Sequence, residues 1–161
     1  MVQVITLVVM IALVAVDQII KLLVVKYLEP IGSMPLIKGF VSFTYSENTG
    51  AAFGSFSKYT YLLSIVTFIV IAVGLYYIFS KKIKFGIEYC SIVAVLSGGI
   101  GNLIDRVIRG YVVDFIEPLF IDFAIFNFAD MLITCGAVVL ICYLIVDIIK
   151  DYKKEKTTKN E

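Results

Sequence analysis

Long apolar segments separated by short polar ones dominate the chain. Four of them are long enough to cross a hydrocarbon core of about 30 Å as helices, and we place these spans at residues 4–25, 59–79, 85–106 and 124–149. The span at 59–79 contains no charged residue, whereas the other three contain isolated acids or bases. The pattern predicts an all-α integral membrane protein in which residues 1–161 form a single membrane domain.

The two longer connections, at 27–58 and 107–123, are too apolar to be plain linkers. The stretch VSFTY at 41–45 alternates apolar with hydroxyl-bearing residues, which is the period of a strand with one apolar face. Asn48 is placed to cap a short interfacial helix over Ala51 to Phe53. The second connection is rich in aromatic residues, which favour the membrane–water interface. We therefore expect a small extracytoplasmic cradle containing β-structure and a short interfacial helix.

The positive charges predict the orientation of the spans. Lysines cluster in the short turn at 80–84 and in the polar tail at 150–161. Because cytoplasmic segments of membrane proteins are enriched in Lys and Arg, we expect these two segments, and both termini, in the cytoplasm. The connections at 27–58 and 107–123 then face outward.

The amino-acid composition excludes several classes of active site. The chain is 60% hydrophobic with a formal net charge of +1, which fits a membrane protein and argues against a nucleic-acid partner. It contains no His, so a Ser-His-Asp triad, a Cys-His dyad and a His-based zinc site are excluded. The three cysteines lie in apolar runs without metal-ligand spacing. We expect neither a metal nor a cofactor.

Charged residues inside the spans need an interaction partner or a functional role, because inserting a carboxylate at mid-bilayer depth costs roughly 2.5–3.5 kcal/mol of free energy. Asp17 and Lys21 are four residues apart and share a helical face. They form either an ion pair that fixes helix packing or part of a substrate site, and we expect Lys21 to extend outward to the interface. Asp105 and Arg106 lie at the outer end of the third span, where a structural role is favoured.

Amide and glycine residues accompany these acids. Asn102 precedes Asp105 by three residues, and Asn127 precedes Asp130 by three. This spacing predicts that each amide hydrogen-bonds the carboxylate that follows it on the same helical face. Gly98 has no side chain, so at this position another backbone can come close to the third span. This allows either ordinary close helix packing or the approach of a substrate backbone.

Asp114 and Asp130 remain, and a short connection can bring both to one place at the outer membrane boundary. Two carboxylates held close together cannot easily both ionise, so one keeps its proton. The ionised acid can then take a proton from water while the other supports the attacked carbonyl oxygen. Acids near span ends also suit a small four-helix proton- or cation-coupled transporter, or a non-catalytic packing subunit, and the spacing alone leaves these alternatives open.

Five motifs extend this interpretation. DQIIK begins at Asp17, ENTGAAFG at Glu47, GNLIDR at Gly101, VVDF at Val112 and FNFADM at Phe126. Because these five motifs occur in this order, the chain resembles the bacterial lipoprotein signal peptidases, also called signal peptidase II, over nearly its whole length.

The resemblance implies an aspartyl endopeptidase that removes the signal peptide from diacylglyceryl-modified prolipoproteins by cutting just before the lipidated cysteine. Asp114 and Asp130 would be the catalytic pair. Further motif positions would bind substrate or support the pair: Asn48, Gly50, Gly98, Asn102, Arg106, Asn127 and Ala129. Asp17, Lys21 and Asp105 would be structural polar residues.

The resemblance also implies the setting of the reaction. We expect a multi-pass, monomeric protein of the bacterial cytoplasmic membrane, in contact with membrane phospholipid and with its active site near the outer face. Inhibition by cyclic peptide antibiotics of the globomycin type is implied as well.

Overall fold

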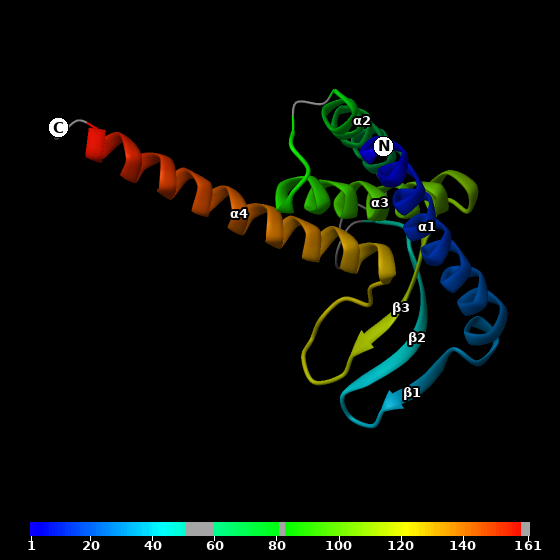
Figure 1. Ribbon diagram of the computed structural model, residues 1–161. Helices are drawn as coiled ribbons and strands as arrows, with labels where there is room; N and C mark the ends of the chain where they lie inside the picture. Colours follow the sequence, from blue (N-terminus) through cyan, green and yellow to red (C-terminus); the bar gives the residue numbers. More distant parts are fainter. Residues whose placement is uncertain (51–59, 81–82, 159–161) are drawn as a thin grey trace.

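Four long helices and a small sheet make up the computed structural model, which describes residues 1–50, 60–80 and 83–158. Figure 1 shows the sheet beyond the end of the helices at which α1 ends and α4 begins. In chain order the elements are α1 (Val2–Leu23), η1 (Val24–Leu28), η2 (Glu29–Ile31), β1 (Ser33–Ile37), β2 (Val41–Asn48), α2 (Thr60–Phe79), α3 (Ile87–Ile108), β3 (Val112–Pro118) and α4 (Phe128–Thr158).

Four long helices were predicted, and among the described residues the structure has four that are each long and apolar enough to cross a bilayer. They differ in burial: half of the most apolar window of α3 is buried, against 6–17% for the other three helices. The central helix α3 is also the one rich in glycine, serine and buried polar residues. Small residues let neighbouring backbones approach, which is how membrane helices pack without a hydrophobic driving force between them.

The sheet is antiparallel, with strand order β1-β2-β3. The alternating stretch at 41–45 lies in β2, so the predicted strand is confirmed. Gly39, with φ of 75°, permits the tight turn between β1 and β2, because this backbone region strains residues that carry a Cβ. Across the sheet, Ser46 pairs with Asp114 and Asn48 pairs with Val112. This register carries Asn48 to the start of β3.

Several boundaries differ from the sequence-based ones. The fourth helix begins at Phe128 rather than at 124, because the chain before it is held extended by a bridge between Ile116 and Phe126. That helix also continues to Thr158, so most of the expected polar tail at 150–161 is helical. The first helix continues beyond 25 through one π-helical and one 3₁₀ segment to Ile31. The short interfacial helix expected at 51–53 lies outside the described residues.

Candidate active site

The start of α4 fixes the Asp130 carboxylate. Asn127 immediately precedes the helix and exchanges two hydrogen bonds with Asp130. The Asp130 amide donates to Asn127 Oδ1 (2.9 Å), and the Asn127 amide donates to Asp130 Oδ2 (3.2 Å). Such a reciprocal pair is a capping box, which satisfies backbone N–H groups that the first helical turn leaves without partners. Asn127 and Asp130 are thus in contact as a helix cap, but the predicted bond from the Asn127 side-chain amide to Asp130 is not formed, because that amide donates to Asp114 and Asn102 instead.

Side-chain amides join the two acids. Asn127 Nδ2 donates to Asp114 Oδ1 (2.6 Å), and Asn102 Nδ2 donates to Asp130 Oδ1 (2.7 Å). The two amides also meet each other, since Asn127 Nδ2 lies 3.2 Å from Asn102 Oδ1. The other oxygen of Asp114 accepts a bond from Asn48 Nδ2 (2.9 Å). Each of the four carboxylate oxygens thus accepts an N–H, and the pair is held in one network.

The two carboxylates have different environments. Asp114 lies in β3 with 1% of its surface exposed, whereas Asp130 is only partly buried and lines a pocket. Burial and the nearby Asp130 charge raise the pKa of Asp114 to about 6, although the hydrogen bonds from Asn48 and Asn127 oppose this effect. A carboxyl group in such surroundings retains its proton to higher pH than an exposed one does.

A buried ion network lies on the α1 side of the site. Lys21 Nζ is 2.9 Å from both Asp17 Oδ2 and Asp105 Oδ2, so the predicted ion pair with Asp17 is confirmed. The second oxygen of Asp17 accepts a bond from the Ala129 amide (3.0 Å), and Asp105 Oδ2 accepts one from the Val113 amide (3.3 Å). The network therefore anchors the backbone directly before each acid of the pair, Ala129 before Asp130 and Val113 before Asp114.

Two sequence-based predictions about this network are wrong. Lys21 does not extend to the interface, because it is 0% exposed and holds two carboxylates inside the bundle. Asn102 does not bond Asp105; its amide reaches across to Asp130 on α4, while Asp105 turns to Lys21. In both cases a partner on another element replaces the neighbour on the same helix.

Glycines on α3 allow this close assembly. A Cβ at Gly98 would overlap the carbonyl oxygen of Ala129, and a Cβ at Gly101 would lie 2.5 Å from Asp17 Oδ2. At Gly99, by contrast, an added Cβ would make an ordinary contact with Ile71 (3.6 Å). Gly98 thus allows close helix packing, which brings the start of α4 against α3.

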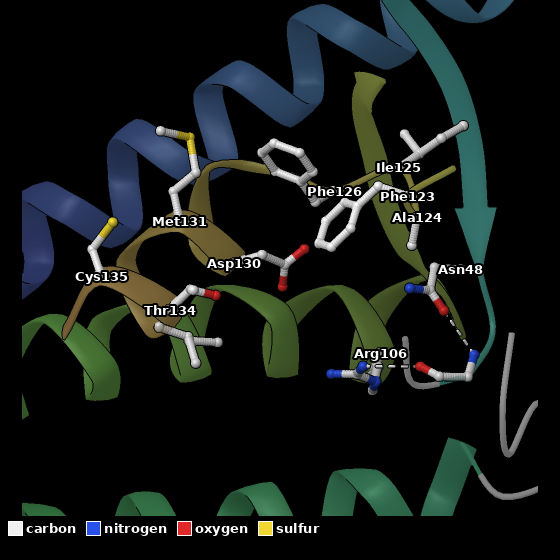
Figure 2. Close-up of a pocket in the computed structure, with 12 residues that line it drawn as sticks. Asn48, Arg106, Phe123, Ala124, Ile125, Phe126, Asp130, Met131, Thr134 and Cys135 are labelled. Atoms are coloured by element: carbon white, nitrogen blue, oxygen red, sulfur yellow. Dashed lines mark hydrogen bonds between the residues drawn. The ribbon is translucent and has the colours of Figure 1, made fainter. Parts of the chain in front are cut away.

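A pocket of about 510 Å³ opens beside Asp130. Figure 2 shows the Asp130 carboxylate facing a space between the rings of Phe123 and Phe126 and the Arg106 side chain. Arg106 donates to the Gly50 carbonyl oxygen (3.3 Å) and acts electrostatically on both acids of the pair. The remaining lining residues are Asn48, Ala124, Ile125, Met131, Ile133, Thr134 and Cys135. An apolar chamber with a few convergent polar groups is typical of a binding site.

The apolar walls of this pocket were missed from the sequence. Asp130 and Thr134, like Met131 and Cys135, are spaced by four residues along α4, and this spacing could have revealed the wall. The motif residues Asn48, Gly50, Asn102, Arg106, Asn127 and Ala129 do converge around the two acids. Their roles in a reaction remain predictions.

Comparison with known proteins identifies the family. The sequence model of the family described as Signal peptidase (SPase) II matches residues 9–146. The chain belongs to the signal peptidase II family. This peptidase is 46% identical over 124 residues to the lipoprotein signal peptidase of Caldanaerobacter subterraneus subsp. tengcongensis, covering 77% of this chain and 84% of that relative. It is 42% identical over 133 residues to the enzyme of the same name from Streptococcus thermophilus, covering 83% and 87%.

Solved structures resemble the peptidase as well. One bacterial membrane enzyme superposes with a TM-score of 0.80 at 33% identity, covering 89% of this chain and 88% of the other. A second gives a TM-score of 0.76 at 33% identity, covering 86% and 91%. The peptidase is accordingly a multi-pass membrane protein with a known fold.

Proposed function

We propose that this peptidase is an aspartic endopeptidase that removes the signal peptide from diacylglyceryl-modified prolipoproteins by cutting just before the lipidated cysteine. Asp114 and Asp130 are its catalytic pair. The observation that carries the proposal is the single amide network in which Asn127 and Asn102 link two carboxylates from different elements. The family and its lipoprotein signal peptidase members supply the substrate class, and they favour this reading over the transporter.

The different environments of the two acids suggest their roles. Asp130 faces the pocket, where it acts as the general base and takes a proton from water as the water oxygen attacks the peptide carbonyl carbon. Asp114 acts in its protonated form, which is favoured below a pH of about 6, and gives its proton to the carbonyl oxygen as the tetrahedral intermediate forms. When the carbon–nitrogen bond breaks, Asp130 passes its proton to the leaving amine, and Asp114 recovers its own. The amides of Asn48 and Asn127 keep Asp114 in place throughout.

The pocket walls suit a lipid-bearing substrate. Phe123, Phe126 and Met131 present apolar surface beside Asp130, while Arg106 and Asn48 offer hydrogen-bond donors at the other side. Acyl chains favour an apolar, water-poor surface, whereas the peptide backbone requires polar partners. We therefore expect an unmodified precursor to be a poor substrate.

Turnover of a diacylglyceryl-modified precursor by the purified protein in detergent tests the catalytic pair. Asp114→Asn and Asp130→Asn should each abolish release of the signal peptide while the protein keeps its thermal unfolding transition. Asp122→Asn and Asp147→Asn are matched controls, because these acids are exposed on the connection after β3 and on α4. Near-normal turnover by either variant of the pair would refute the assignment.

The location of the site follows from the charge distribution. The lysines of the 80–84 turn and of the 150–161 tail support a cytoplasmic position for these segments and for both termini. The sheet and the catalytic pair then lie at the outer face of the cytoplasmic membrane. Single cysteines introduced at Ser33 and at Lys84, with the native cysteines replaced, should react with an impermeant maleimide in intact spheroplasts only at Ser33.

The pocket beside Asp130 is also where a cyclic peptide inhibitor of the globomycin type would bind. Such a compound should compete with the precursor, raising its KM without changing kcat. We propose that the active form is a monomer surrounded by phospholipid, since the pair and its network come from one chain. Turnover per molecule that falls on dilution in detergent would contradict this.

A further inference from the structure

All three N–H groups of the buried Lys21 ammonium have an acceptor. Two of these acceptors are the carboxylates of Asp17 and Asp105, and the third is Asn102 Oδ1, each at 2.9 Å. Lys21 is 0% exposed, so no N–H is left to water. An ammonium with three fixed acceptors has one defined orientation.

The third bond is not explained by helix packing. The two carboxylates already neutralise the ammonium and tie α1 to α3. Asn102 is neutral, and its other end contacts Asp130 rather than any part of the ion network. The bond from Lys21 to Asn102 therefore connects the ion network to the candidate catalytic pair.

This bond determines which way the Asn102 amide points. Its Oδ1 accepts from Lys21 Nζ (2.9 Å) and from Asn127 Nδ2 (3.2 Å), which fills both lone pairs. Its Nδ2 is then directed to Asp130 Oδ1 (2.7 Å). A reversed amide would place its NH₂ group against the ammonium and its oxygen against a carboxylate, so both contacts would become repulsive. Lys21 thus excludes the reversed orientation.

We propose that Lys21 is a positioning residue for the peptidase reaction, holding the Asn102 amide so that its N–H meets Asp130. This proposal rests on the proposed function, because it requires Asp130 to act in the reaction. It gives the lysine of the DQIIK motif a role beyond the structural ion pair.

The test must separate this role from stability. Lys21→Met removes all three donors but leaves two buried carboxylates without their cation, which destabilises a bundle. Lys21→Met combined with Asp105→Asn keeps the summed formal charge of Lys21, Asp17 and Asp105 unchanged. Compared with Asp105→Asn alone, the double variant should lower kcat about tenfold to a hundredfold, as expected for a small misplacement of a reacting group. Its KM should stay within about threefold.

A second comparison uses Asn102→Ala, measured as single-turnover cleavage. If Lys21 acts through Asn102, adding Lys21→Met to this background should lower the rate by no more than about twofold. The proposal is overturned if kcat of the charge-matched double variant equals that of Asp105→Asn, or if Lys21→Met has its full effect without Asn102. Failure of both Lys21 variants to fold also counts against it, because the ammonium would then serve the bundle itself. Turnover by Asp114→Asn or Asp130→Asn would instead refute the catalytic pair.

Discussion

The buried position of Asp114 makes fold stability depend on pH. Its pKa is raised from an ordinary value of 3.8 to about 6, first by burial and then by the Asp130 charge. The folded protein therefore binds this proton more tightly than the unfolded chain does. The linked stability is fully present below pH 3.8 and is lost as the pH rises through about 6. At neutral pH the loss is about 3 kcal/mol of unfolding free energy.

Asp114→Asn removes this titration. The variant loses a carboxylate oxygen that accepts an amide N–H, which costs about 1 kcal/mol at every pH. For a chain of this size, each kcal/mol of unfolding free energy shifts the unfolding temperature by about 2–4 °C. Between pH 4 and pH 8, the unfolding temperature of the wild type should therefore fall by about 6–12 °C relative to that of the variant. An inactive variant would then be the more stable protein at pH 8.

Thermal unfolding in detergent, followed by circular dichroism at several pH values, measures this difference. Titrating groups that do not interact with Asp114 are common to both proteins and cancel in the comparison. Asp122→Asn, an exposed acid of the neighbouring connection, should unfold in parallel with the wild type. If the unfolding temperatures of Asp114→Asn and of the wild type change in parallel between pH 4 and pH 8, the raised pKa of Asp114 is refuted.

Three further predictions concern the surroundings of the pair. Gly98→Ala should lower turnover about a hundredfold, because a methyl group there pushes the start of α4 away by roughly 1 Å. The control variant Gly99→Ala should turn over substrate at a rate near that of the wild type, and equal effects of the two substitutions would contradict the packing argument. Cys135 lines the pocket and should react with a water-soluble maleimide, with protection by substrate, while the other two cysteines in the spans stay unlabelled. Asn127→Ala should speed amide exchange in the first turn of α4 and reduce turnover in the same variant, and unchanged exchange would count against the cap.

Hydropathy was sufficient to predict the helices, because a bilayer requires long apolar runs. The alternation at 41–45 likewise predicted β2. The strand β3 was missed, since its residues Val112 to Phe115 are all buried and show no alternation. A strand covered on both faces is recognised from its neighbours rather than from its own sequence.

The residues of the candidate site were named from the sequence, but several of their contacts were not predicted. Asp114, Asp130 and Asn127 were identified, and their convergence is observed. Spacing rules describe contacts along one helix, however, and the partners of Asn102 and Lys21 come from other elements. Such contacts depend on how closely the helices approach, which sequence periodicity does not report.

The capping box has a consequence for heat inactivation. Asn127 and Asp130 close the end of α4 through their backbone N–H groups and one side-chain oxygen each, and other atoms of the same two side chains belong to the network that links the acids. Melting of a single terminal turn should therefore disperse the proposed catalytic pair. Helix ends open far more readily than whole bundles do. Warming should therefore inactivate the enzyme reversibly at temperatures where nearly all of its helical circular dichroism signal persists. Cooling should restore its activity without any refolding of the bundle.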